Sequence, residues 1–161
     1  NNMYGSTTDF KDGIRSSAEY AYDLNGNLIQ DLNKGIGQIK YNSLNLPDTV
    51  IVDEKHCIYY RYGGEGSKFR VIHKDSVENV TDYCGNVIYD NDVLHKVLTE
   101  EGFVTFENRV PVYHYFLQDH QGNNRMVIRQ DGTKEEVNHY YPFGGLFGES
   151  KGMQKQAYKY N

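Results

Sequence analysis

Three side-chain oxygens near the start of the sequence have the spacing of calcium ligands. Asp23, Asn25 and Asn27 occupy the first, third and fifth places of an EF-hand loop. The other places do not fit, because the sixth is Leu28 instead of glycine and the twelfth is Lys34 instead of glutamate. The sequence therefore predicts no metal site here, and we expect no cofactor elsewhere in the chain.

The histidines and cysteines do not form a pattern that is typical of catalysis or metal binding. Of six histidines, only His114 and His120 are close in sequence, and a predicted turn separates them, so we expect surface or hydrogen-bonded side chains. Cys57 and Cys84 are too few for a thiolate metal site. We expect two unpaired thiols, although a single bridge stays open, and Cys84 lacks the neighbouring base that a nucleophile needs.

Two pairs of adjacent carboxylates are the remaining candidates for acid–base chemistry. Glu100 and Glu101 form one pair, and Glu135 and Glu136 form the other. Neighbouring residues on a strand point to opposite faces, whereas acid–base pairs must face each other across a cleft. We therefore interpret these residues as solvated edges and predict a protein that is not an enzyme; a glycosidase is the least favoured hypothesis.

The composition favours a β-sheet protein with one solvent-exposed face, and it argues against nucleic acid and membranes as partners. The 161 residues include 15 tyrosines and 7 phenylalanines but no tryptophan, and only 38% are hydrophobic. The net charge of −5 is spread along the chain, so it gives no electrostatic signature for nucleic acid. No apolar run reaches the roughly 18 to 20 residues that span a bilayer, so we expect no membrane insertion.

One short phrase, Asp-x-x-Gly-Asn, occurs three times, at residues 23–27, 82–86 and 119–123. An aspartate at the start of a turn can accept hydrogen bonds from backbone N–H groups two residues on, and a glycine supplies the left-handed backbone. Tyrosines at 22, 41, 62 and 83 recur about every twenty residues and precede turns. We predict that these residues form structural turns: Tyr22, Asp23, Gly26, Asn27, Asp82, Gly85, Asn86, Asp119, Gly122 and Asn123, with Arg125 pairing with Asp119 or capping a carbonyl.

Alternating apolar and polar residues between these turns predict antiparallel strands. The expected strands are 18–23, 27–31, 36–41, 48–53, 56–62, 68–74, 77–83, 86–90, 102–107, 112–118, 124–130 and 133–141, with a type I′ turn at Asp131-Gly132. Residues 91–101 fit either a helix or a strand; the local pattern favours a helix, and the repeat context favours a strand. The fold class is thus all-β, made of successive antiparallel hairpins in a curved sheet.

The repeated tyrosine–aspartate turns resemble the YD repeat of the Rhs family, and the later part of the chain resembles the repeat-associated core of that family. The core match rests on Asp119, Gly122, Asn123, Arg125, Tyr140, Tyr141, Pro142, Phe143 and Gly144. These motifs are most similar to those of Rhs-type proteins of the Bacteroidetes. We divide the chain into an irregular N-terminal segment (1–17), YD-like hairpin repeats (18–110), core-like hairpins (111–148) and a tail (149–161).

The resemblance implies a hairpin shell that encloses or presents a C-terminal effector in a secreted or cell-surface bacterial protein. Because the chain opens without an initiator Met, we expect a fragment of a longer protein whose remainder, and possibly an effector, are its partners. No Asp-Pro dipeptide occurs, so neither self-cleavage nor an effector is assigned to these residues. The few hairpins predict an open partial shell, or a sheet completed by a second copy along its edges.

The main alternative function is an adhesion or carbohydrate-binding module that uses exposed tyrosines as stacking platforms. The stretch YYPFGGLFG suggests where a sugar or partner would bind, through Tyr140, Tyr141 and Phe143. The same aromatics could equally cover the face of the sheet.

Overall fold

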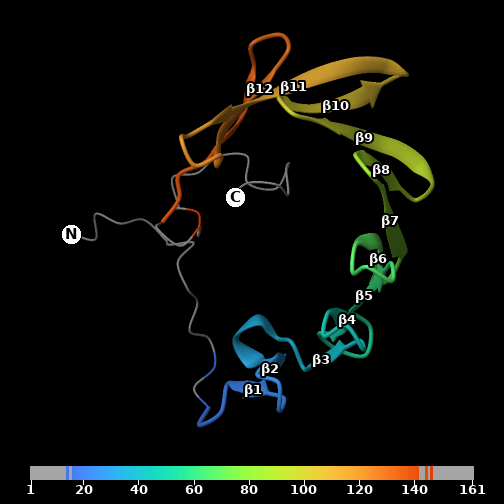
Figure 1. Ribbon diagram of the computed structural model, residues 1–161, viewed down its shortest axis with the longest axis vertical. Helices are drawn as coiled ribbons and strands as arrows, with labels where there is room; N and C mark the ends of the chain where they lie inside the picture. Colours follow the sequence, from blue (N-terminus) through green and yellow to red (C-terminus); the bar gives the residue numbers. More distant parts are fainter. Residues whose placement is uncertain (1–13, 15, 142–143, 145, 147–161) are drawn as a thin grey trace. The chain divides into compact units, whose positions relative to one another are not determined.

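The computed structural model describes residues 14, 16–141, 144 and 146 (Figure 1). These residues divide into two compact units. The described residues up to His95 belong to one unit and those from Lys96 to the other. The strands are β1 (Tyr20–Tyr22), β2 (Leu28–Asp31), β3 (Gln38–Tyr41), β4 (Pro47–Ile51), β5 (Cys57–Tyr62), β6 (Lys68–Lys74), β7 (Glu78–Cys84), β8 (Val87–Asp90), β9 (Val93–Thr99), β10 (Gly102–Glu107), β11 (Val110–Gln118), β12 (Asn124–Arg129) and β13 (Lys134–Val137).

The predicted all-β class of antiparallel hairpins is confirmed. β1 and β2 pair as a two-stranded sheet, and β3 to β13 follow one another in chain order in an eleven-stranded sheet that does not close. The one helical segment in the described residues is a single 3-10 turn, η1 (Leu32–Lys34), which Asp31 caps by accepting a hydrogen bond from Lys34 N–H. Among the same residues there is no long apolar helix of the kind that crosses a membrane.

Residues 93–99 of the ambiguous segment form strand β9, so the strand alternative is confirmed. The preceding residues explain the choice: Asn91 and Asp92 have φ values of 49° and 63°, as in a type I′ turn. Such a turn leads directly into a strand that folds back, and it leaves no room for a helix N-terminus. Within β9, Lys96 is buried whereas Val93 is exposed.

The turn at Asp131-Gly132 is not the predicted type I′ turn. Only Gly132 has a positive φ, of 86°, whereas a type I′ turn needs two such residues. Gly132 N–H donates to the Arg129 carbonyl and Arg129 N–H donates to the Thr133 carbonyl, which closes a three-residue loop. The following strand also stops at Val137, short of the predicted end at 141.

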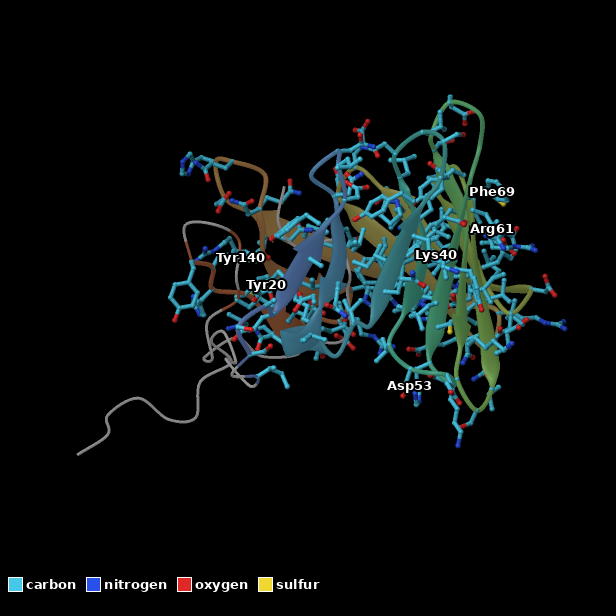
Figure 2. All side chains as sticks on the ribbon, turned by 90° about the horizontal axis from the view of Figure 1, so that it is seen from below. Tyr20, Lys40, Asp53, Arg61, Phe69 and Tyr140 are labelled. Atoms are coloured by element: carbon cyan, nitrogen blue, oxygen red, sulfur yellow. The ribbon has the colours of Figure 1, made fainter. Side chains whose placement is uncertain are left out.

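Each unit has a thin core on one face of its strands. Val50, Val71 and Ile88 are buried in the first unit, and Phe103 and Val127 are among the buried residues of the second. Cross-strand pairing places such residues side by side, because partners across an antiparallel ladder share a face. The strand ends carry the loops, and Figure 2 shows Asp53 in one of them, between β4 and β5.

Candidate functional site

The first Asp-x-x-Gly-Asn phrase forms a five-residue turn between β1 and β2. Asp23 N–H donates to the Asn27 carbonyl, and Gly26 N–H donates to the Asp23 carbonyl. Asp23 Oδ1 accepts hydrogen bonds from the N–H groups of Asn25 (2.9 Å) and Asn27 (2.8 Å), while Asn27 Nδ2 donates to Oδ2 (2.9 Å). The hydrogen bond from the Asn27 side chain is the main cause of a lowered pKa at Asp23. Both oxygens of this carboxylate are therefore used within the turn.

The same backbone turn recurs at Asn42, Gly63 and Asp119. The third of these five-residue turns in the first unit is Gly63–Ser67, in which Gly63 N–H donates to the Ser67 carbonyl and Gly66, with φ of 88°, donates its N–H to the Gly63 carbonyl. Asn42 Oδ1 accepts from the N–H groups of Leu44 and Leu46, and the fourth residue, Asn45, has φ of 61°. Asp119 Oδ1 accepts from the N–H groups of the third and fifth residues at 3.0 Å each, and Gly122 has φ of 84°. We number the turn residues 1 to 5, so that position 0 precedes and position 6 follows the turn.

The Asp82 phrase does not form this turn, and its predicted cap is wrong. Cys84 pairs with Val87, so the hairpin has a two-residue loop of Gly85 and Asn86, and Gly85 has φ of 65°. The strand therefore includes Asp82, whose carboxylate receives two hydrogen bonds from Arg70 on β6 at 2.5 and 2.9 Å. Gly85 has the predicted positive φ, but Asp82 is a cross-strand ion-pair partner.

Three tyrosines at position 0 of a turn bind the backbone next to an earlier five-residue turn. The Tyr41 hydroxyl donates to the carbonyl of Leu28 (2.8 Å), and the Tyr62 hydroxyl donates to the carbonyl of Pro47 (2.9 Å). In both cases the acceptor is position 6 of the preceding five-residue turn. In the second unit the Tyr140 hydroxyl donates to the carbonyl of Asn124 (2.7 Å), which is position 6 of the Asp119 turn. We call this interaction the tyrosine–carbonyl contact.

Tyr140, Tyr141, Gly144 and Leu146, the described residues near the end of the chain, make contacts that match those of the same turn. Gly144 has φ of 83° and its N–H donates to the Tyr141 carbonyl, and Tyr140 forms a β-bridge with Leu146. These are the contacts of positions 4, 1, 0 and 6. Sequence reasoning missed this turn, although the signal was present: a tyrosine four residues before a left-handed residue, as in Tyr22 and Gly26.

The residues predicted for sugar or partner contact have different environments. Tyr140 is half-buried, and burial raises the pKa of its hydroxyl to about 12, against a smaller opposing effect of Arg125. Tyr141 is 41% exposed, and Phe143 lies outside the described residues. The Arg125 guanidinium lies 5.6 Å from the centroid of the Tyr140 ring and does not bind Asp119, so the predicted pairing is wrong. The reason is that Gln121 and Asn123 already occupy that carboxylate.

Removing one tyrosine–carbonyl contact is expected to destabilise the first unit. Tyr62→Phe keeps the ring but leaves the Pro47 carbonyl without its donor, which costs about 1 kcal/mol of unfolding free energy. The matched control is Tyr59→Phe. No described residue forms a hydrogen bond with the Tyr59 hydroxyl, and the Tyr59 ring contacts Arg61. Urea unfolding of the two variants checks this; equal midpoints would mean that the contact adds no stability.

A buried polar cluster in the second unit contradicts the prediction for the acidic pair. Glu136 is 1% exposed and the Glu135 side chain is 14% exposed, so these carboxylates are not solvated edges. Glu135 Oε2 lies 2.5 Å from Nδ1 of His114, and the other ring nitrogen lies 2.8 Å from Thr105 Oγ1. The bulge between β12 and β13 explains this, because Val127 pairs with Glu136 and Ile128 with Lys134. Glu135 therefore faces no partner on β12.

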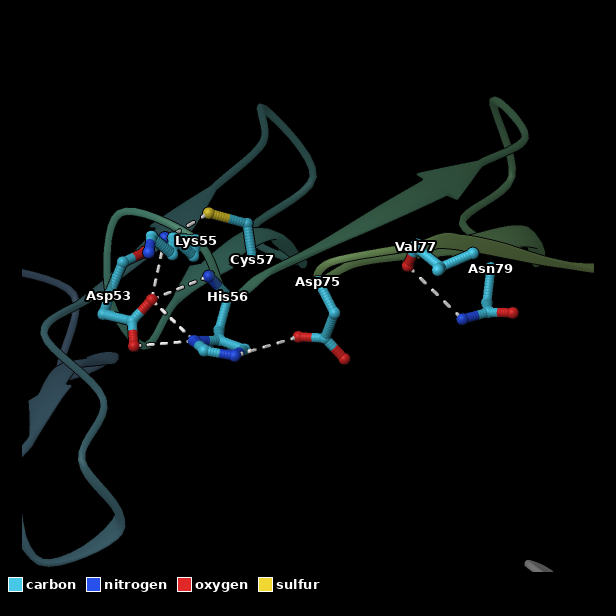
Figure 3. A network of polar contacts seen from close by, with 7 residues as sticks. All are labelled: Asp53, Lys55, His56, Cys57, Asp75, Val77 and Asn79. Carbon is cyan, nitrogen blue, oxygen red and sulfur yellow. Dashed lines mark hydrogen bonds and ion pairs between the residues drawn. The ribbon is translucent and has the colours of Figure 1, made fainter.

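At a loop edge of the first unit, His56 connects two loops (Figure 3). Its Nδ1 lies 2.6 Å from Asp53 Oδ2 in the same loop, and its Nε2 lies 3.5 Å from Asp75 Oδ1 in the loop between β6 and β7. The pKa of His56 is raised mainly by the Asp53 hydrogen bond, then by the charges of Asp53 and Asp75.

Cys57 and Cys84 are both free thiols.

The raised pKa of His56 predicts a specific dependence of stability on pH. A group whose pKa is higher in the folded state contributes stability that is present below the unfolded value of 6.5 and is lost as pH rises through the folded value. In an NMR titration of the ring protons, Asp53→Asn is expected to lower the pKa of His56 more than Asp75→Asn does. Equal shifts in the two variants would contradict the assignment to Asp53.

No group of three or more His, Cys, Asp or Glu side chains in the described residues is arranged to hold a metal ion. The candidate site is therefore the set of repeated turns and tyrosine–carbonyl contacts. Its geometry positions hairpins against one another and leaves Asp23 and Asp119 engaged with their own turns.

The fold is similar to parts of solved toxin-complex structures. The Photorhabdus luminescens Tc holotoxin pore with a TccC3 substitution matches with a TM-score of 0.68 and 16% identity, over 86% of this chain and 8% of that chain. The TcdB2-TccC3-TEV structure matches with a TM-score of 0.63 and 17% identity, over 78% and 7%. TcdB2-TccC3 without its hypervariable C-terminal region matches with a TM-score of 0.61 and 15% identity, over 79% and 8%.

No family model and no curated protein matches the chain. The chain spans less than a tenth of the length of the solved chains that it matches, covering 7% or 8% of each. At such low identity the likeness concerns the fold, and it supports the Rhs-like fold that the sequence motifs imply.

Proposed function

We propose that this chain is a non-enzymatic structural segment of an Rhs/YD-repeat protein, part of a β-shell that encapsulates or presents a C-terminal effector. The observation that carries the proposal is that the polar side chains of the turns form hydrogen bonds with the backbone. Asp23 and Asp119 bind their own turns, and Tyr41, Tyr62 and Tyr140 each bind the backbone carbonyl that directly follows an earlier five-residue turn. Groups held in this way position the backbone and are not free to act on a substrate.

The structures with this fold support a toxin-related setting. One is described as a holotoxin pore, and another as a complex without its hypervariable C-terminal region. By this likeness we assign the chain to a secreted or surface-exposed bacterial protein whose remaining segments complete a curved shell. Its partners are then the rest of the parent chain and an enclosed C-terminal effector.

The proposal is tested by measuring how well the C-terminal effector, the domain that follows the shell, is protected from a protease. The parent protein is digested with its native segment and, in parallel, with Gly102→Ala, which is expected to disrupt the strand pairing of the second unit. A shell predicts that the native protein is cut in the following domain at least about tenfold more slowly than the variant, since cleavage follows the population of the open form. Equal rates would contradict encapsulation.

The adhesion or carbohydrate-binding alternative has one specific observation in its favour. Tyr113 and Tyr115, two residues apart on β11, are 46% and 43% exposed, so they lie on the same face of the sheet. Aromatic rings exposed in this way offer flat apolar area with a polar edge. On a glycan array, the scaffold proposal predicts no bound glycan, whereas a sugar-binding module predicts a signal that Tyr113→Ala or Tyr115→Ala removes.

A further inference from the structure

Two interactions repeat between successive hairpins of the first unit. The first is the tyrosine–carbonyl contact, in which position 0 of one turn binds position 6 of the turn before it. Tyr41 does this to Leu28, and Tyr62 does it to Pro47, with donor–acceptor distances of 2.8 and 2.9 Å. In both cases the following hairpin supplies the hydroxyl, and the preceding hairpin supplies the backbone oxygen.

The second interaction brings position 5 of one turn against position 4 of the next. Asn27 Nδ2 donates to Asn45 Oδ1 at 2.6 Å, which joins the first turn to the second. Leu46 plays the same part toward the third turn, because its Cδ1 lies 3.4 Å from where a Cβ would stand on Gly66. The first and second turns therefore each cover one residue of the turn that follows.

The first turn has the two residues that the following hairpin contributes to this interface, namely the tyrosine at position 0 and the residue at position 4. No described residue occupies the place of a preceding hairpin beside them. Tyr22 is its position 0; the residue is 60% exposed, and within the described residues its hydroxyl makes no hydrogen bond. Gly26 is its position 4, and a Cβ placed there would meet nothing within 4 Å. The outward-facing Leu24 of the same turn is fully exposed.

We propose that β1 and the first turn are a docking surface for one further hairpin with the same five-residue turn. Its position 6 carbonyl accepts the hydrogen bond from Tyr22, and its position 5 side chain covers Gly26. The occupant follows from continuity with the interface that Tyr41 and Tyr62 already use, and the inference rests on the proposed scaffold function. A further segment of the parent chain supplies this hairpin.

The hairpin at residues 36–53 is the best available probe for this surface. Its position 5 residue, Leu46, already covers a glycine, and its position 6 carbonyl, on Pro47, already accepts from a tyrosine. The required partner at the first turn has the same chemistry, namely Gly26 and Tyr22. A second copy of residues 36–53 is therefore fused ahead of the complete chain, which gives the hairpin a high effective concentration.

Hydrogen–deuterium exchange of β1 (Tyr20–Tyr22) is the readout. We expect about tenfold slower exchange in the fusion than in a control fusion that carries the same residues in scrambled order. In the fusion, Tyr22→Phe is expected to make β1 exchange about fivefold faster, because the substitution removes the hydroxyl alone. Equal exchange in the fusion and the scrambled control would overturn the proposal.

Self-association gives a second way to overturn the proposal. If sedimentation shows that the unfused chain associates and that β1 protection rises with its concentration, a second copy is the occupant instead. Protease protection of the following domain does not enter either measurement. A chain that fails as a shell can therefore still pass this test, and the reverse also holds.

Discussion

Gly102→Ala is expected to destabilise the second unit by about 3 kcal/mol or more, because the added methyl group meets backbone. A Cβ at this position would lie 1.9 Å from the carbonyl oxygen of His114 and 2.9 Å from its carbonyl carbon. Gly102 is buried and sits between Thr99 of β9 and Tyr115 of β11. Neither neighbour can move away without breaking its ladder, so the clash must separate the strands.

The matched control is Gly132→Ala in the same unit. Gly132 has φ of 86°, so an alanine there is strained, but its Cβ would meet nothing within 4 Å. We expect a loss of about 1 to 2 kcal/mol for the strain of the left-handed backbone alone. Urea unfolding followed by circular dichroism measures both variants. If Gly102→Ala unfolds at the same urea concentration as Gly132→Ala, close packing at Gly102 does not contribute.

Strands and five-residue turns could be predicted from the sequence because both depend on local rules. Alternating polarity marks strands such as β11 and β12. At Asp23 and Asp119, the acceptor at position 1 and the glycine at position 4 close the turn as the motif predicts. The tyrosines at position 0 also show a period, but their acceptors are backbone carbonyls, which no sequence pattern reveals.

The failures occur where a residue on another strand decides the outcome. Asp82 has the same local phrase as Asp23, yet it lies in β7, because Cys84 pairs with Val87 and Arg70 faces the carboxylate from β6. A phrase that fits both a five-residue and a two-residue loop cannot be resolved locally. Arg125 illustrates the same limit, since its contact is the distant Tyr140 ring instead of the nearby Asp119.

The burial of Glu135 and Glu136 could not be predicted for a related reason. Alternation places adjacent residues on opposite faces only while the register is regular. The β12–β13 register shifts between Val127 and Ile128, and Glu135 falls at this shift. A register shift depends on how two strands pair, so neither strand sequence reveals it alone.

The second large effect is expected for His114→Ala, which removes a buried group that three neighbours contact. His114 is 7% exposed, stacks on Phe103 with ring centroids 4.4 Å apart, and bridges Thr105 and Glu135. Deleting one partner of a buried pair leaves the other carboxyl without its hydrogen bond and opens a cavity. We expect a loss of about 3 to 5 kcal/mol in unfolding free energy, measured by urea denaturation.

A control and a rescue separate this prediction from a general sensitivity of the second unit. His120→Ala changes an exposed histidine in the Asp119 turn and is expected to stay within about 0.5 kcal/mol of the native protein. The double variant His114→Leu with Glu135→Leu replaces both members of the pair by apolar groups, so it should be more stable than His114→Leu alone, because no carboxylate is left buried without a partner. If the double variant is as unstable as the sum of its single changes, the two side chains are not energetically coupled, and the 2.5 Å contact between them does not hold β11 against β13.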